Sequence, residues 1–201
     1  MLKRFFGFVE ISTKLASLFP FLLGLVLTIK LYGAANWVNT AIFFASMLLF
    51  DMTATAINNY IDTRTNGRPL QFSRPIGLAI ILVMLSLAIA LGLVLTLRTD
   101  LVVLVAGAAC FAVGIFYTFG PAPISRMPLG ELFSGLFMGF FIPFLVLQVN
   151  APAGSLVNIV LDAQLVNVSL RWPALLLLVL WTVTPMATIA NIMLANNICD
   201  V

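Results

Sequence analysis

A polar pattern that occurs twice provides the residues of this chain best suited to chemistry. Residues 58–62 read Asn-Asn-Tyr-Ile-Asp and residues 196–200 read Asn-Asn-Ile-Cys-Asp, so both fit Asn-Asn-x-x-Asp. In a helix, residues three and four positions apart share a face, so each copy gathers its amides and its carboxylate. Two such faces that meet form an acidic chamber with the following members: Asn58, Asn59, Asp62, Asn196, Asn197 and Asp200.

The ligand types in this chamber favour a hard cation. The chain contains no histidine at all, which excludes serine-hydrolase triads, imidazole bases and histidine-ligated metals. Carboxylate and amide oxygens suit Mg²⁺, which proteins hold through few carboxylates and share with substrate phosphate oxygens. The alternative is that each Asp and Asn caps a helix end and reaches into water. The repetition of all three polar positions favours the magnesium interpretation.

The elements that position these residues are membrane-spanning helices. Hydrophobic residues make up 62% of the 201 positions and charged residues 8%, which is far too apolar for a soluble domain. The apolar residues form continuous blocks near the span length of about 20 residues, whereas barrel strands would be short and alternating. We expect an all-α polytopic bundle, a single domain over residues 1–201, with six spans: 15–32, 37–57, 76–97, 101–119, 129–149 and 172–197.

The distribution of basic residues predicts the orientation in the membrane. Seven of them lie on the side of the chain's first residue and of the ends of the even-numbered spans: Lys3, Arg4, Lys14, Arg64, Arg68, Arg74 and Arg126. Three lie on the other side: Lys30, Arg98 and Arg171. By the positive-inside rule, the first side is cytoplasmic, so both Asn-Asn-x-x-Asp motifs face the cytoplasm. The charge of +3 gives no indication of nucleic-acid binding.

Several residues near the two motifs are candidates for substrate contacts. Arg64 and Arg68 follow the first motif and suit a phosphate clamp, although either also serves as a plain membrane anchor. Asp51 lies eleven residues before Asp62, on the same helix face and about 16 Å deeper. Two interpretations of Asp51 are equally open: it contacts an acceptor substrate, or it forms a structural hydrogen bond to a neighbouring helix.

The segment after the fourth span is a further candidate for closing the chamber. Prolines at positions 121, 123 and 128 stiffen it, and we expect Tyr117 and Arg126 to approach a bound diphosphate. Glu131 lies in the first turn of the fifth span, where a carboxylate interacts favourably with the helix dipole. The small residues Gly135 and Gly139 in that span predict close helix packing.

At these residues the sequence resembles the UbiA superfamily of intramembrane prenyltransferases, and most closely its 1,4-dihydroxy-2-naphthoate polyprenyltransferases of menaquinone synthesis. The stretches that carry the resemblance are 14–18, 50–62, 117–139 and 190–200. The resemblance implies that Asn58, Asn59 and Asp62 form the first magnesium–diphosphate motif. It implies likewise that Asn197 and Asp200 begin the second.

The resemblance also implies partners, a location and a reaction. A polyprenyl diphosphate ionises at its allylic C–O bond, and dihydroxynaphthoate attacks the freed cation and loses its carboxylate. Asp62 and Asp200 are then the catalytic carboxylates, with Asn58 as a further metal ligand. The lipid bilayer of a bacterial cell holds the enzyme.

The chain departs from the family pattern in two respects. The superfamily commonly has an aspartate at the position of Asn59 and an acid at that of Asn66, so this chain offers a metal fewer carboxylates. Family members continue past the second motif to a further acid and about three more helices, whereas this sequence ends at Val201. We therefore expect a C-terminally truncated prenyltransferase with about six of nine helices.

Three other functions compete with this interpretation. The first is a prenyltransferase with another acceptor, such as a different quinone precursor, haem or a glycerol phosphate. The second is an ion-coupled transporter, which predicts helices broken near the middle of the membrane. The third is a fragment without activity that binds lipid or partner helices.

Overall fold

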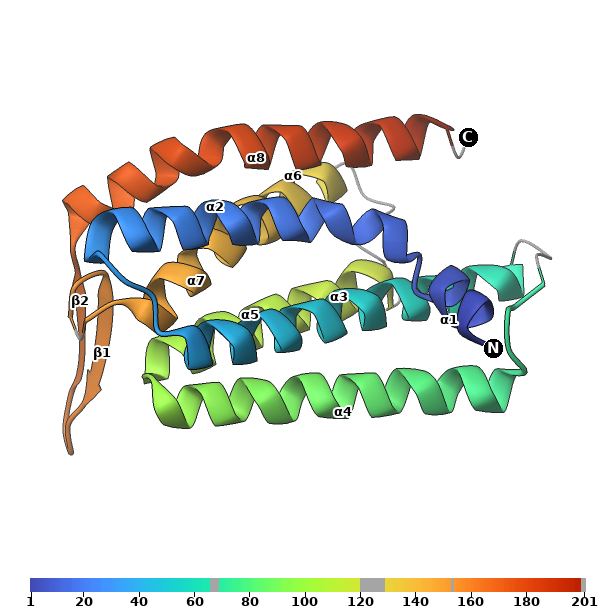
Figure 1. The fold of residues 1–201 in the computed structure, drawn as a ribbon, viewed down its shortest axis with the longest axis horizontal. Coiled ribbons are helices and arrows are strands. Elements are labelled where there is room, and N and C mark those ends of the chain that lie inside the picture. Colours follow the sequence, from blue (N-terminus) through green and yellow to red (C-terminus); the bar gives the residue numbers. More distant parts are fainter. Residues whose placement is uncertain (66–68, 120–128, 153, 200–201) are drawn as a thin grey trace.

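The computed structural model describes residues 1–65, 69–119, 129–152 and 154–199 as a helical bundle with one β-hairpin (Figure 1). The side chains of residues 64, 65, 118, 196, 197 and 199 lie outside this description. The long helices run side by side along one direction, and the hairpin lies across one end of the bundle (Figure 1). The all-α polytopic fold predicted from the sequence is confirmed.

The elements follow one another in a simple up-and-down order. The helices before residue 120 are α1 (Leu2–Phe8), α2 (Leu15–Tyr32), α3 (Trp37–Thr65), α4 (Arg74–Arg98) and α5 (Leu101–Thr118), with a 3-10 turn at Ile11–Lys14. The elements after it are α6 (Gly130–Ser134), a π-helical segment (Gly135–Phe141), α7 (Ile142–Asn150), β1 (Val157–Leu161), β2 (Val166–Leu170) and α8 (Trp172–Cys199).

Five helical stretches of the described chain are long and apolar enough to cross a membrane: Ile11–Tyr32, Trp37–Thr63, Arg74–Arg98, Gly130–Asn150 and Trp172–Ala195. Many of their large apolar side chains are exposed in the isolated chain, such as Leu82, Val83 and Leu180. Only lipid can cover so much apolar surface at this length, so the chain is an integral membrane protein. Each of the six predicted spans corresponds to a helical stretch, and the fourth, α5, is apolar but slightly shorter than this length within the described residues.

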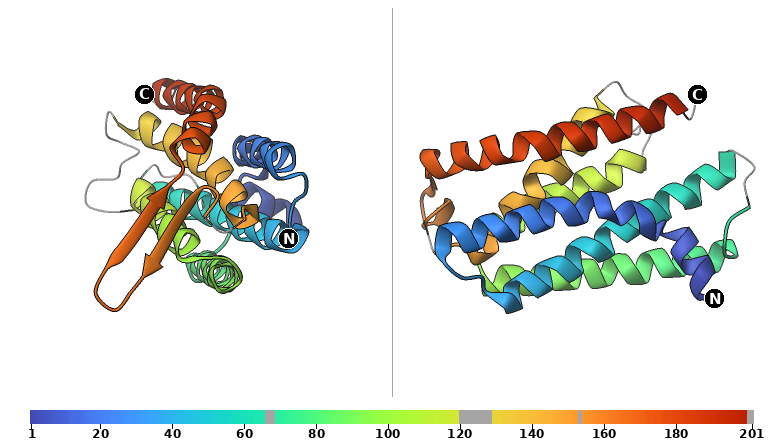
Figure 2. Two further views of the ribbon diagram at one scale, coloured as in Figure 1. Left: turned by 90° about the vertical axis from the view of Figure 1, so that its left-hand side faces the viewer. Right: turned by 45° about the horizontal axis from the view of Figure 1, so that its top comes forward.

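The two ends of the bundle carry different parts of the chain. One end, here called the motif end, holds the first residue, the end of α3 at Thr65 and the end of α8 at Cys199 (Figures 1 and 2). The opposite end, the hairpin end, holds β1, β2 and the start of α8. The helix ends that carry the two Asn-Asn-x-x-Asp motifs therefore emerge on the same side of the bundle.

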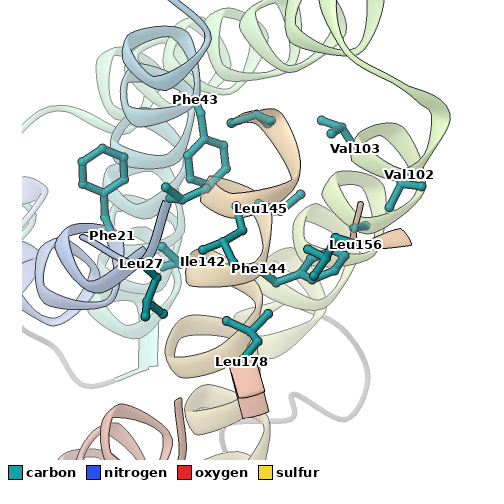
Figure 3. Close-up of a cluster of buried hydrophobic side chains, with 14 of the residues drawn as sticks. Phe21, Leu27, Phe43, Val102, Val103, Ile142, Phe144, Leu145, Leu156 and Leu178 are labelled. Atoms are coloured by element: carbon teal, nitrogen blue, oxygen red, sulfur yellow. The ribbon is translucent and has the colours of Figure 1, made fainter. Parts of the chain in front are cut away.

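The span Gly130–Asn150 forms the centre of the bundle. Of the residues in its most apolar stretch, 61% are buried, whereas the corresponding share in the other four spans is 17–33%. Phe144 and Leu145 of α7 pack in one cluster with Phe21 of α2, Phe43 of α3 and Leu178 of α8 (Figure 3). The π-helical segment ends two residues before Pro143, whose missing N–H removes one hydrogen bond of a regular helix.

Glycines let the central span approach its neighbours closely. A Cβ on Gly139 would lie 2.6 Å from the Met186 backbone of α8, and one on Gly135 would lie 2.6 Å from the Met186 carbonyl. On the other side, a Cβ on Gly24 of α2 would lie 2.9 Å from Cα of Pro143. The close packing predicted for the fifth span is confirmed, and small residues are what lipid-embedded helices need for such contacts.

The β-hairpin was not expected from the sequence. β1 and β2 pair antiparallel, from Val157 opposite Leu170 to Leu161 opposite Val166. The hairpin occupies residues between the fifth and sixth predicted spans, to which no element had been assigned. The alternation of apolar and polar residues in 166–170, together with the β-branched residues of 157–161, is the signal that predicts it.

The packing of Gly139 yields a testable prediction. Replacing Gly139 with Ala forces α8 away from the central span, and overpacking of this kind destabilises by about 1–3 kcal/mol. The matched control is Gly107→Ala in α5, since a Cβ there meets nothing within 4 Å. Unfolding in mixed detergent micelles should show a lower midpoint for Gly139→Ala and an unchanged or slightly higher one for Gly107→Ala. Equal midpoints for the two variants would contradict this packing.

Candidate active site at the motif end

One face of α3 carries most of the candidate site. Phe44, Met47, Asp51, Asn58 and Asp62 recur at intervals of three, four or seven residues, so they form one stripe along the helix. The stripe is polar toward the motif end and apolar deeper in the bundle. α3 remains helical to Thr65, which places the whole first motif within a regular helix. Asn58 is exposed and Asp62 is half-buried.

A buried ion pair fixes the middle of this stripe to α2. The Lys14 ammonium donates to Asp51 Oδ1 at 2.8 Å, to the Asp51 backbone carbonyl at 3.2 Å and to Thr55 Oγ1 at 2.5 Å. The Ser17 hydroxyl donates to Asp51 Oδ2 at 2.6 Å. The side chains of Lys14 and Asp51 are 7% and 18% exposed, so both charges are largely removed from solvent. All three donors of the ammonium are used, which leaves Lys14 no donor for a ligand in this arrangement.

This geometry matches the structural interpretation of Asp51, in which a neighbouring helix holds the carboxylate. The pairing of Lys14 and Ser17 with Asp51 was not predicted, since Lys14 was counted only as a basic flank of the first span. A usable signal exists in the sequence. A lone carboxylate inside an apolar span requires a cation or several donors, and Lys14 is the lysine at the entry of the neighbouring span.

The N-terminal segment covers one side of the first motif. The Asn59 amide donates to the Phe8 carbonyl and to Glu10 Oε1, both at 3.0 Å. Glu10 adopts a left-handed conformation with φ of 47°, which turns the chain from α1 into the 3-10 turn. Asn59 therefore ties α3 to α1, whereas Asn58 and Asp62 lie on the neighbouring face. Substrate binding by Asn59 stays a prediction.

Arg74 closes the end of α3 from the start of α4. Its guanidinium donates to the Tyr60 carbonyl at 3.3 Å and lies 5.2 Å from the centre of the Tyr60 ring. A cation near the last carbonyls of a helix is favourable for the helix dipole. Arg74 thus acts on the protein itself and joins the start of α4 to the part of α3 that carries the first motif.

Tyr117 approaches the central span at the same end. Its hydroxyl is buried and forms no hydrogen bond of good geometry within the described part of the chain. Ser134 and Glu131 of α6 are its polar neighbours. The Ser134 hydroxyl is thus close enough to interact with Tyr117, which lies where α5 meets α6. This agrees with its predicted place near the diphosphate without testing it.

Several predicted site residues lie outside the described residues. These are Asp200, Arg68 and Arg126, together with the side chains of Arg64 and Asn197. The backbone of α8 up to Cys199 is described, and it brings the second motif to the motif end (Figure 1). α3 packs mainly on α4, whereas α8 packs on α6, the π-helical segment and α2.

The donors of the first motif fit a hard cation in kind but not in number. Asn58 and Asp62 lie one turn apart and offer only oxygen ligands, which suits Mg²⁺. Among the described residues, no group of three or more Asp, Glu, Cys or His side chains gathers. A magnesium ion at Asn58 and Asp62 therefore needs oxygen ligands from its substrate, or from residues outside this description.

An apolar groove begins beside the ion pair. It has a volume of about 200 Å³ and is lined by Ile11, Lys14, Leu15, Ser17, Leu18, Phe44, Met47 and Leu48. Phe44 and Met47 are the deep residues of the α3 stripe, so the groove continues the line of the first motif between α2 and α3. Its lining is apolar apart from Lys14 and Ser17, so it suits an apolar group.

The ion pair gives a second testable prediction. Removing one partner leaves an uncompensated buried charge, so Lys14→Met should reduce the free energy of unfolding by about 3–5 kcal/mol. The double variant Lys14→Met/Asp51→Leu should recover much of this loss, because neither charge is then buried alone. The control is Lys3→Met, which removes an exposed lysine and should leave stability unchanged. A double variant as unstable as the sum of its single variants would show that the two residues act independently.

Comparison with known proteins identifies one relevant similarity. The chain is 32% identical over 140 residues to the 1,4-dihydroxy-2-naphthoate octaprenyltransferase of Bacillus subtilis (strain 168). The alignment covers 63% of this chain and 44% of that protein, so the chain spans less than half of its relative's length. No family model matches the chain, and no solved structure matches it.

This similarity relates part of the chain to a known protein of the predicted kind. The resemblance to UbiA-type prenyltransferases is thereby confirmed: over the aligned part, the chain is a relative of a naphthoate prenyltransferase.

Proposed function

We propose that this chain represents the part of a membrane prenyltransferase that binds the diphosphate and transfers its prenyl group to an aromatic acceptor. The observation that carries the proposal is the common position of the two motif-bearing helix ends. α3 and α8 lie far apart in the sequence, and both end at the motif end (Figure 1). The similarity to a naphthoate prenyltransferase supports the same reaction class and makes 1,4-dihydroxy-2-naphthoate the proposed acceptor.

The residues of α3 would hold the diphosphate end of the substrate. Asn58 and Asp62 supply oxygen ligands on an accessible helix face, and Asp200 is proposed as their counterpart on α8. When bound, magnesium would neutralise charge on the diphosphate and so assist its departure. Arg64, Arg68, Arg126, Asn197 and Tyr117 are proposed as further contacts to the diphosphate.

The reaction would proceed by allylic ionisation. The C–O bond to diphosphate breaks, and the leaving group takes the electron pair. The electron-rich ring of the acceptor then forms the new C–C bond and loses its carboxyl group as CO₂. The surrounding spans exclude water, which protects the cation from hydrolysis. Fixed positive and polar groups at the diphosphate stabilise the charge that develops there.

The groove between α2 and α3 is proposed as the path of the prenyl tail. It lies deeper than Asp62 on the same α3 stripe, and its lining is apolar apart from Lys14 and Ser17. A substrate whose diphosphate binds at Asp62 would place its tail along Met47 and Phe44. Lys14 and Asp51 neutralise each other at the mouth of the groove, so the tail would meet no unpaired charge there.

The motif end is proposed to face the cytoplasm. This end holds α1 and the starts of α2 and α4, which carry or adjoin Lys3, Arg4, Lys14 and Arg74 (Figures 1 and 2). The hairpin end holds the ends of α2 and α4 and the start of α8, which carry or adjoin Lys30, Arg98 and Arg171. Cytoplasmic ends of spans are enriched in Lys and Arg. This orientation gives the site access to a soluble diphosphate head group while the tail remains in lipid.

The enzyme interpretation is favoured over an ion-coupled carrier. A carrier of this type uses helices broken near the middle of the membrane to form its ion sites. α3 and α8, which carry the motifs, are continuous helices of 29 and 28 residues. The polar residues of the first motif occupy the last turns of α3, which suits a site at the membrane surface.

The test compares two substitutions of Asp to Asn. Asp62→Asn removes a ligand carboxylate and should lower kcat/KM for prenyl transfer by about 100-fold or more, because several kcal/mol of charge stabilisation are lost. Asp162→Asn makes the same chemical change in the exposed turn of the hairpin and should leave the rate unchanged. The assay uses membranes that contain the protein, Mg²⁺, a polyprenyl diphosphate and dihydroxynaphthoate.

Both variants must be present in equal amounts and have the same unfolding midpoint. Undiminished turnover by Asp62→Asn would refute the role of the first motif. Turnover that needs no divalent cation would refute the magnesium part of the proposal. A normal rate of diphosphate release with no prenylated naphthoate would support the ionisation step and show that dihydroxynaphthoate is not the acceptor.

A further inference from the structure

The β-hairpin has one apolar and one polar face. The cross-strand pairs Val157–Leu170, Ile159–Val168 and Leu161–Val166 alternate with Asn158–Ser169 and Val160–Asn167. Because successive residues of a strand point to opposite faces, all six residues of the first three pairs lie on one face. Every member of that face is aliphatic, and the opposite face carries three polar side chains and one valine.

The protein covers the apolar face only at the β1 side of its base, since Leu170 of β2 is 40% exposed there. Val157 and Ile159 pack against the central hydrophobic cluster, and β1 contacts α5. Toward the tip the same face is open: Leu161, Val166 and Val168 are 62%, 64% and 57% exposed. Leu165 in the turn is 66% exposed. The covered base shows that the apolar face points toward the helices, and its outer part continues beyond them.

The hairpin is fixed in direction by hydrogen bonds at its base. The Gln148 amide donates to Asp100 Oδ2 at 2.7 Å and to the Val157 carbonyl at 3.0 Å. Asp100 in turn accepts from the backbone N–H of Val103 and caps α5. The Arg171 N–H donates to the Leu156 carbonyl and closes the base of the hairpin. The strands are therefore tied to the ends of α5 and α7.

The hairpin lies at the level where the membrane meets water. Its strands run across the helix direction, hence along the membrane plane, and project beyond the outline of the bundle (Figures 1 and 2). Trp37 and Trp172 begin α3 and α8 at this same end, and they are 64% and 63% exposed. Exposed tryptophans at span ends mark the interfacial layer. Trp172 follows β2 by only two residues.

We propose that the hairpin lies on the membrane surface, with the outer part of its apolar face in contact with lipid and its polar face in water. The only charged residue between Val157 and Leu170 is Asp162 in the turn. Attachment is thus driven by apolar burial rather than by attraction to anionic head groups. The outer edges of a two-stranded sheet keep unpaired N–H and C=O groups, which hold it in the hydrated interface rather than in the hydrocarbon core.

The test measures lipid contact residue by residue. Single cysteines at Leu161, Val166, Asn167, Val168 and Ser169 are introduced after replacement of Cys110 and Cys199 by Ala, and they carry a nitroxide label. The protein is placed in nanodiscs of phosphatidylcholine, a lipid without net charge. Labels at 161, 166 and 168 should collide with oxygen, which dissolves in lipid, in preference to a polar nickel chelate. Labels at 167 and 169 should show the opposite preference.

Other results overturn the proposal. Preference for the nickel chelate at all five positions would place the hairpin in water. Protection of 166 and 168 from both reagents would show that protein covers the apolar face. Spin–spin broadening that disappears on dilution with unlabelled protein would identify that cover as a second copy. Strong dependence on anionic lipid would exclude attachment through apolar burial.

A pair of double substitutions separates lipid contact from folding of the hairpin. With the label at 161, Val166→Asp/Val168→Asp should abolish the preference for oxygen. Asn167→Asp/Ser169→Asp adds the same charges on the polar face and should preserve it. Loss of the preference in both variants would contradict the assignment of the two faces.

Discussion

Backbone N–H and C=O groups inside a bilayer must bond within the protein, and this constraint shapes every part of the chain. It makes the spans helical, because a helix satisfies its own backbone. It also moves polar chemistry to the helix ends, where Asn58, Asp62 and Tyr117 lie. The hairpin, whose edges are not satisfied internally, is confined to the surface at the opposite end. The candidate site and the hairpin therefore lie at the two ends of the bundle, where the lipid interior ends and polar groups can reach water.

Polar side chains within the spans follow the same rule. Lys14 and Asp51 are tolerated because each neutralises the other, and Ser17 and Thr55 complete their hydrogen bonds. This pair connects α2 to the stripe of α3 that continues to Asp62. Asn59 connects the same helix to α1. The first motif therefore stands on a helix that is held from two sides, which is how a rigid ligand site is built.

Much of the fold was predictable, because span length and glycine content act locally. The helices, the ends of α3 and α8 on the same side of the bundle, and the packing of Gly135 and Gly139 follow from periodicity and topology. The partner of Asp51 was not predictable, because Lys14 lies 37 residues away and only the packing of the helices brings the two together. The hairpin was missed although residues 166–170 alternate between apolar and polar, because the apolar residues were interpreted only by the length of membrane spans.

The central claim is that the ends of α3 and α8 share one magnesium-bound diphosphate. Iron-directed cleavage tests it directly: Fe²⁺ replaces Mg²⁺, a prenyl diphosphate is added, and ascorbate with peroxide generates radicals that cut the backbone near the metal. The account predicts diphosphate-dependent cuts both near Asp62 and near Asp200, and none in the hairpin. Cuts at one motif alone, or cuts that do not depend on the diphosphate, would contradict a shared site.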